Sequence, residues 1–170
     1  MTLAWLLFDW GDTLMFEDGP QDRPMADWPE VRVLDGAVEV LTGLAQRWPL
    51  ALATNATISD HASIRRALAR VGLDALVRAI FCHRDLGLKK ADPRFWDAVT
   101  ARLAVPPAQL LMVGDDLEND VLAPRRAGLT SIWLNWKHAP LPTGVALPAG
   151  LDLPTIERLE QLPPLLARLI

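Results

Sequence analysis

The sequence predicts an α/β fold of three layers, in which helices cover both faces of a central parallel sheet of about five strands. Short apolar runs of strand length recur along the chain, each stopping on a polar residue, and segments with helical periodicity separate them. Buried parallel strands are nearly continuous apolar runs, and strands that alternate with helices form sheets of this kind. A Rossmann-like arrangement is therefore expected.

Five apolar segments are the expected strands. The first, residues 3–8, is almost entirely apolar and is closed by Asp9 and Gly11. Its length suits a buried strand rather than a helix. The other four are residues 50–53, 76–82, 110–113 and 130–134.

Capping residues and glycines mark the helices between these strands. Asp35 is the expected N-cap of a helix that ends before Pro49, and Ser59 or Asp60 is the expected N-cap of the next. Asp92-Pro93 predicts a third helix, because proline is favoured at the first helical position. A fourth helix is expected around residues 118–127, where Pro124 implies a kink or a late start. A short helix over residues 156–169 ends the chain.

The length and composition fit one domain covering residues 1–170. The chain has 170 residues, of which 51% are hydrophobic and 22% charged, enough for a real core. Residues 15–34 show no helical or strand period and carry three prolines, so they are expected to form a short loop or flap. Residues 139–154 are rich in proline and glycine and are expected to be a second loop.

Charge and cysteine usage predict a soluble cytoplasmic protein. The net charge is −4 and no basic run exceeds two residues, so no patch for nucleic acid or an anionic membrane is expected. The single cysteine, Cys82, excludes an internal disulfide and fits a reducing compartment. The apolar N-terminal stretch ends at Asp9, too early for a membrane span.

Polar side chains with complementary chemistry follow the expected strands. Because the carboxyl ends of parallel strands meet at one edge of a sheet, these side chains are expected to converge. Carboxylates that converge repel one another unless a cation lies between them, and oxygen ligands favour Mg²⁺. A threonine hydroxyl, free backbone N–H groups and an ammonium suit a phosphate. The residues concerned are Asp9, Thr54, Asn55, Lys90, Asp115, Asp116 and Asp120.

Each of these residues also has an ordinary structural interpretation. Asp9 could be a turn acid, Thr54-Asn55 a helix cap, and Lys90 a solvent-exposed cation. Asp115 and Asp116 could belong to a solvated helix start. Only their joint occurrence, in this order, favours a catalytic site.

The four motifs together resemble those of the haloacid dehalogenase (HAD) superfamily of hydrolases. The family places a nucleophilic aspartate after its first strand, with Thr or Val at the fourth position after it, as in Asp9 and Thr13. Its second motif is a Thr or Ser that ends the next strand, as Thr54 does. Its third is a lysine, here Lys90 in the run Lys90-Ala91-Asp92-Pro93, and its fourth is Gly-Asp followed by another acid, here Gly114-Asp115 and Asp120.

This resemblance implies a Mg²⁺-dependent phosphohydrolase with an aspartyl-phosphate intermediate on Asp9. It implies that Asp9, the carbonyl of Gly11 and Asp115 hold the metal, with Asp116 and Asp120 as further candidates. It also implies that Thr54, Asn55 and Lys90 hold the phosphoryl oxygens.

Gly11 departs from the family pattern. Family phosphatases usually carry a second aspartate there, which protonates the leaving group and is worth roughly 10²–10⁴-fold. Asp12 could substitute for it, or the substrate could need no acid, as for an acyl phosphate. A third alternative is a dehalogenase or phosphonatase, and a fourth is a HAD-fold binding module without activity.

The short insertion at residues 15–34 implies an essentially capless enzyme with an open site. Such a site has room for a phosphorylated small molecule or macromolecule, or for a second copy of the chain that acts as a lid in a homo-oligomer. The substrate itself cannot be derived from the sequence.

Overall fold

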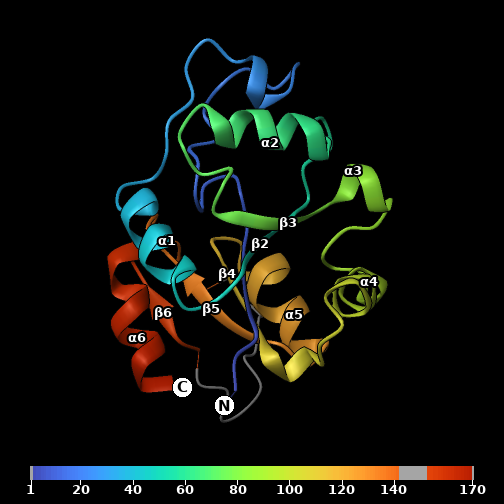
Figure 1. Cartoon of the computed structure of the whole chain (residues 1–170), viewed down its shortest axis with the longest axis vertical. Helices are drawn as coiled ribbons and strands as arrows, with labels where there is room; N and C mark the ends of the chain where they lie inside the picture. The colour runs from blue at the N-terminus through green and yellow to red at the C-terminus, as the bar shows by residue number, and fades with distance from the viewer. Residues whose placement is uncertain (1, 142–152, 170) are drawn as a thin grey trace.

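The computed structural model describes residues 2–141 and 153–169. Its centre is a six-stranded sheet in the order β3-β2-β1-β4-β5-β6, with every neighbouring pair parallel (Figure 1). The predicted α/β fold is therefore confirmed. The strands are β1 Trp5–Phe8, β2 Leu50–Thr54, β3 Val77–Cys82, β4 Leu110–Gly114, β5 Thr130–Leu134 and β6 Thr155–Ile156.

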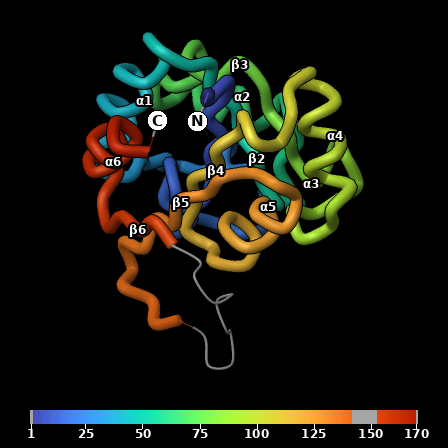
Figure 2. The backbone as a smooth tube through the Cα atoms, turned by 90° about the horizontal axis from the view of Figure 1, so that it is seen from below, coloured from blue at the N-terminus to red at the C-terminus, as the bar shows by residue number. Residues whose placement is uncertain are grey.

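Helices pack on both faces of this sheet (Figures 1 and 2). They are α1 Ala37–Ala45, α2 His61–Ala69, α3 His83–Leu86, α4 Pro93–Leu103, α5 Ala123–Arg126 and α6 Leu162–Leu169. Short 3₁₀ turns occur at Met25–Asp27, Pro107–Gln109 and Leu159–Gln161, and a π-helical turn covers Leu117–Leu122.

Alternation along the strands divides the core into two halves. In β1, Leu6 and Phe8 belong to one hydrophobic cluster, together with apolar residues of α1, α2 and α6. Leu7 belongs to the other, which includes Phe95 and Trp96 of α4. Since successive side chains of a strand point to opposite faces, both faces of the sheet are buried, as three layers require.

Two predicted helix caps are confirmed and one is wrong. Asp60 accepts a hydrogen bond from the backbone N–H of Ser63 at 2.9 Å, and Asp92 accepts one from Arg94 at 3.0 Å. Asp35 does not cap α1, because the chain turns one residue later at Gly36. Gly36 has φ 76°, a left-handed conformation that glycine adopts without a Cβ penalty.

The C-terminal part contains the largest departure from the expected elements. Residues Thr155–Ile156 form β6 beside β5, and α6 starts only at Leu162, although a helix was expected from Ile156. The break expected at Pro124 is present, since α5 begins at Ala123 with proline in its first turn. Of the loop expected over residues 139–154, residues 142–152 lie outside the described part of the chain.

Residues 15–34 form an extended loop with one 3₁₀ turn, close to the expected flap. Met15 bridges Val33, and the backbone N–H of Phe16 donates to the carbonyl of Arg32 at 3.0 Å, so the two ends of the loop are held together. Its far part lies against α2, where Arg70 donates to three loop carbonyls, those of Ala26, Trp28 and Pro29.

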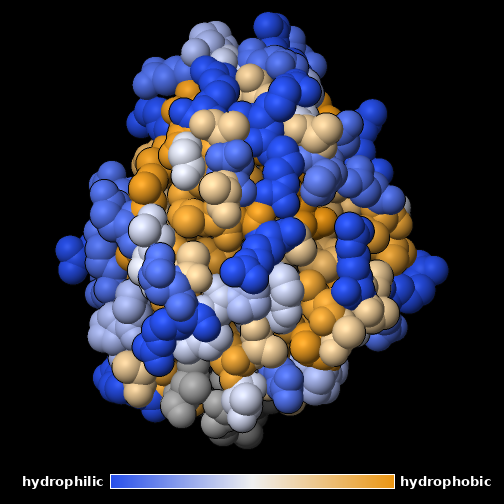
Figure 3. Space-filling model, viewed as in Figure 1, coloured by the Kyte–Doolittle hydropathy of each residue, from blue (hydrophilic) through white to orange (hydrophobic). Residues whose placement is uncertain are grey.

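Within the described ranges, none of the helices is long and apolar enough to cross a membrane. Figure 3 shows hydrophilic and hydrophobic residues mixed over the face seen in Figure 1. Among the described residues, the exposed large hydrophobic side chains are Ile58 and Leu141.

Candidate active site

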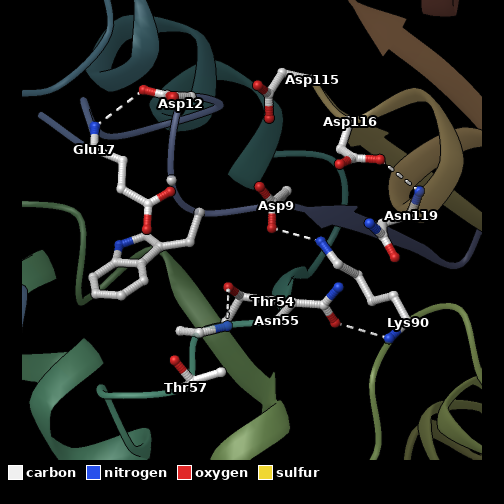
Figure 4. A pocket seen from close by; sticks show the side chains of 13 residues that line it. Asp9, Asp12, Glu17, Thr54, Asn55, Thr57, Lys90, Asp115, Asp116 and Asn119 are labelled. Carbon is white, nitrogen blue, oxygen red and sulfur yellow. Dashed lines mark hydrogen bonds and ion pairs between the residues drawn. The ribbon is translucent and has the colours of Figure 1, made fainter. Parts of the chain in front are cut away.

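A polar pocket of about 310 Å³ opens at the carboxyl ends of β1, β2 and β4. β1 lies between β2 and β4, so the connections on its two sides run in opposite directions across the sheet. Open α/β sheets bind ligands where the strand order reverses in this way. Asp9 follows β1, Thr54 ends β2 and Asp115 follows β4, so local chain direction alone brings the three residues to one place (Figure 4).

Three carboxylates meet beside this pocket. One oxygen from each of Asp9, Asp115 and Asp120 lies within 4.8 Å of the others. Asp120 is fully buried, and its close approach depends on Gly114, because a Cβ at that position would lie 2.3 Å from the Asp120 Cγ. The glycine of the Gly-Asp motif therefore makes room for the third acid.

Lys90 lies between two of these acids. Its Nζ donates to Asp9 Oδ1 at 2.6 Å and also to Asp120 Oδ1. Burial by itself lowers the pKa of Lys90, but the charges of Asp120 and Asp9 outweigh it, so the pKa is raised and the ammonium stays charged. Asn55 positions this residue, since its Oδ1 accepts the backbone N–H of Lys90 at 2.8 Å.

Asp115 has an electrostatic environment that favours a cation. Burial and, after it, the charge of Asp9 raise the pKa of Asp115 to about 6, against the opposing effect of Lys137. The hydroxyl of Thr13 donates to Asp115 Oδ1 at 3.3 Å and accepts the backbone N–H of Asp115 at 3.1 Å. Thr13 thus ties the first motif to the fourth.

The donor set fits Mg²⁺. It consists of carboxylate oxygens without sulfur or imidazole, which suits a hard divalent cation. Lys90 and Lys137 bring two positive charges to the four carboxylates of Asp9, Asp12, Asp115 and Asp120, which leaves an excess of negative charge. The pKa of Asp120 is also raised, by burial and by Asp9, against the effect of Lys90. A divalent ion beside Asp9 and Asp115 would remove this excess of negative charge.

The structure separates Asp116 from the acid cluster. Asp116 Oδ1 caps the turn that follows, accepting the backbone N–H of Asn119 at 2.8 Å, as Figure 4 shows. The backbone N–H of Asp116 donates to Asp120 Oδ2 at 3.0 Å. Asp116 therefore contacts Asp120 through its backbone, and its side chain lines the pocket rim.

Thr54 and Asn55 line the pocket beside Lys90, where the sequence expected them. The Thr54 hydroxyl accepts the backbone N–H of Ala56 at 3.2 Å and is buried. A hydroxyl and backbone N–H groups at the end of a strand can bind the oxygens of an anion.

Asp12 turns away from the nucleophile position. Its Oδ1 accepts the backbone N–H of Glu17 at 3.0 Å and its Oδ2 pairs with Lys137 at 2.6 Å. Its backbone has φ 52°, and its carbonyl accepts the indole N–H of Trp136 at 2.7 Å. Both oxygens and the carbonyl of Asp12 are thus bonded, and the residue anchors the start of the flap.

Two charged residues of the pocket region were missed in the sequence. Lys137, after β5, bridges Asp12 and Asp115. Glu17 lines the pocket from the flap; partial burial raises the pKa of Glu17, and the charges of Asp9, Asp12 and Asp115 add to the effect. Neither residue follows a strand directly, so no sequence signal separates them from the other charged loop residues.

The indole of Trp133 forms a further link to the site. Its Nε1 donates to the carbonyl of Asp115 at 2.8 Å, whereas Trp136 donates to that of Asp12. Trp10 also lines the pocket, although most of its side chain is buried.

The curated proteins that resemble this chain include a nucleotidase and phosphatases. Pyrimidine 5'-nucleotidase YjjG of Escherichia coli (strain K12) is 30% identical over 130 residues, which cover 76% of this chain and 56% of that protein. YfnB of Bacillus subtilis (strain 168) is 30% identical over 105 residues, or 61% of this chain and 43% of that protein. The chain thus spans about half the length of the curated relatives it matches.

Solved structures share the fold along nearly the whole chain. An uncharacterized protein from Listeria monocytogenes serotype 4b has a TM-score of 0.86 at 26% identity, with 98% of each chain covered. YfnB from Bacillus subtilis, bound to magnesium, has a TM-score of 0.76 at 19% identity, with 98% of this chain and 99% of that one covered. The latter likeness concerns the fold alone.

A family model, described as haloacid dehalogenase-like hydrolase, matches residues 26–128, more than half of the chain. This range includes Thr54, Lys90, Asp115 and Asp120, and it begins after Asp9 and Glu17. Together with the fold and the order of the motifs, this match shows that the chain belongs to the haloacid dehalogenase-like hydrolase family.

Proposed function

We propose that the protein is a Mg²⁺-dependent phosphohydrolase that acts through an aspartyl-phosphate on Asp9. The observation that supports this best is the contact of Asp9 with Lys90 inside a cluster of three carboxylates. An aspartate held in this way has a free oxygen for attack and a cation to offset the charge of an approaching phosphate.

The roles of the other residues follow from their positions. Asp9, the carbonyl of Gly11 and Asp115 would hold Mg²⁺, and a bound ion would supply positive charge to the phosphoryl oxygens. Asp120 keeps Lys90 charged and oriented. Thr54, the Asn55 amide and Lys90 bind the phosphoryl oxygens in line with Asp9.

The substrate class is a phosphate monoester or an acyl phosphate. The pocket is open and polar, and the flap over residues 15–34 is too short to enclose a ligand. This leaves room for a bulky phosphorylated molecule. The shared family with a nucleotidase and the acid cluster favour a phosphorylated substrate over a haloacid.

The first prediction tests this activity with p-nitrophenyl phosphate and acetyl phosphate, with Mg²⁺ and with EDTA. We expect turnover only with Mg²⁺, and a loss of roughly 10³-fold or more in Asp9→Asn, because the nucleophile is removed. Asp97→Asn is the matched control, since Asp97 is an exposed acid on α4 away from the pocket.

Three outcomes would contradict the proposal. Equal rates in Asp9→Asn and the wild type would exclude Asp9 as the nucleophile. Release of chloride from 2-chloropropionate without metal would favour a dehalogenase, the alternative that Gly11 raises. Binding of Mg²⁺ without turnover of either phosphate would favour a binding module.

A further inference from the structure

Cleavage of a phosphate ester leaves an alkoxide that needs a proton, and the usual motif residue for this task is absent at Gly11. The following inference rests on the proposed function. Five carboxyl groups line the pocket, and four already have other partners. Asp9 pairs with Lys90, Asp115 and Asp12 pair with Lys137, and Asp116 caps the turn after β4.

The fifth carboxyl group belongs to Glu17. In the described part of the chain, no hydrogen bond or ion pair engages its carboxylate, although its backbone N–H is bonded. In Figure 4 the carboxylate points into the pocket from the side opposite Lys90, with Asp9 between them. It is thus placed to face a ligand on Asp9.

The position of this carboxylate coincides with the space that Gly11 leaves. A Cβ built on Gly11 would lie 2.4 Å from Glu17 Oε2 and 2.8 Å from its Cδ. No side chain at position 11 can share that space unless Glu17 moves. The Glu17 carboxyl group therefore occupies the space that a side chain at position 11 would need. In this way one carboxyl group still lies where the usual family aspartate would place its own.

The flap holds Glu17 in this position. Its backbone N–H donates to Asp12 Oδ1 at 3.0 Å, and the preceding residues Met15 and Phe16 are bonded to Val33 and Arg32 at the other end of the flap. The residue as a whole is exposed, so its carboxyl group can also exchange protons with water. A general acid and base needs both a fixed position and contact with solvent, because it gives up a proton and regains one in each turnover.

We propose that Glu17 is the general acid and base of this enzyme, reaching the reaction centre from the flap through the space left by Gly11. As Asp9 forms a bond to phosphorus, the bond from phosphorus to the leaving oxygen breaks, and the protonated Glu17 gives its proton to that oxygen. The Glu17 carboxylate then takes a proton from water as this water attacks the aspartyl-phosphate. The bond to Asp9 breaks, inorganic phosphate leaves, and Glu17 is protonated again.

The second prediction is that Glu17→Gln impairs esters with poor leaving groups selectively. We expect kcat/KM for propyl phosphate to fall by roughly 10²–10⁴-fold and that for p-nitrophenyl phosphate by less than about tenfold, because nitrophenolate leaves without a proton. The ratio kcat/KM reports only the steps up to transfer of the phosphoryl group onto Asp9. The later action of Glu17 as a base therefore does not affect the comparison of the two esters. Asp22→Asn, an exposed acid on the same flap, is the control and should change neither value.

A steric swap provides a second test. Glu17→Ala alone should lose most of the propyl phosphate activity, whereas Gly11→Asp combined with Glu17→Ala should regain most of it, because the space that the Glu17 carboxyl group leaves admits a side chain at position 11. A crystal structure with Mg²⁺ and vanadate gives a readout that needs no turnover. We expect Glu17 within about 2.6–3.2 Å of the apical oxygen opposite Asp9.

The outcomes separate this role from the proposed function. Equal losses on both esters in Glu17→Gln, failure of the double variant to recover, or a Glu17 turned to solvent in the vanadate complex would each overturn the role of Glu17. A wild-type protein that cleaves neither ester would overturn the hydrolase proposal and this role together.

Discussion

Asp115 has the clearest electrostatic signature among the candidate metal ligands. Its pKa of about 6 in the folded protein lies above the ordinary value of 3.8. A carboxyl group whose pKa is raised on folding contributes full stability below its unfolded pKa, and this stability is lost as the pH rises through the folded pKa. The metal-free protein therefore loses stability from this group between about pH 4 and pH 7.

The third prediction concerns Asp115→Asn. Without metal, we expect the variant to gain stability over the wild type as the pH rises from 5 to 8, by on the order of 2 kcal/mol, because the ionised carboxylate is removed. Mg²⁺ should raise the melting temperature of the wild type at pH 8 and leave that of the variant unchanged. Thermal melts with Mg²⁺ and with EDTA measure both effects. Parallel pH profiles for the two proteins would contradict this account.

For single residues, the sequence predicted which side chains at the ends of strands belong to the site, and it missed the side chains that loops bring there. Asp9, Thr54 and Asp115 could be placed because a parallel sheet brings the ends of its strands together. Glu17 could not, because its position depends on the path of the flap after Asp12. Asp12 was considered as a substitute acid, and only the structure shows both of its oxygens already bonded.

Helix α2 is the element that fixes the flap. Arg70 donates to the carbonyls of Ala26, Trp28 and Pro29 at 3.1, 2.6 and 3.1 Å, so one guanidinium satisfies three loop carbonyls. Arg66 on the same helix makes only an exposed ion pair with Asp27 at 3.1 Å. Exposed pairs contribute little to stability, whereas hydrogen bonds from a charged donor contribute more.

The fourth prediction compares Arg70→Ala with Arg66→Ala. We expect the first to speed amide exchange at Asp27 and Trp28 by about tenfold or more, since the loop loses three charged hydrogen bonds, and the second to have a smaller effect. Hydrogen exchange measured by mass spectrometry follows these amides, with the amides of α4 as the internal reference. Equal exchange in the two variants would show that the flap does not depend on Arg70.

Elements with a strong local signal were predicted well. The caps Asp60 and Asp92 stand directly before their helices, and the break near Pro124 follows from the missing backbone N–H of proline. β6 was missed because a strand of two residues is too short to show the alternation of apolar and polar side chains. It is recognised only by its pairing with β5. The start of α1 was misplaced by one residue because the left-handed turn at Gly36 is a property of the loop before it.

The two larger hydrophobic clusters of the described residues lie on opposite faces of one sheet, and both contain residues of β1. Neither cluster can lose its packing while the sheet stays intact, because successive residues of the same strands supply the two sides. This arrangement supports the proposal that residues 1–170 form a single domain.

The fifth prediction is that the chain unfolds in one cooperative transition. Differential scanning calorimetry should give a calorimetric enthalpy equal to the van't Hoff enthalpy, near about 120 kcal/mol at roughly 60 °C for a chain of this size. A ratio clearly above one, or two separate peaks, would mean that the flap side and the α4 side unfold independently.

The indole contacts of Trp133 and Trp136 have a practical consequence. Each chromophore is bonded to the peptide carbonyl of an acid at the pocket, Asp115 in one case and Asp12 in the other. A cation or anion that shifts either peptide changes the polarity around an indole, and its emission with it. Occupancy can thus be titrated optically, even in variants that no longer turn over a substrate.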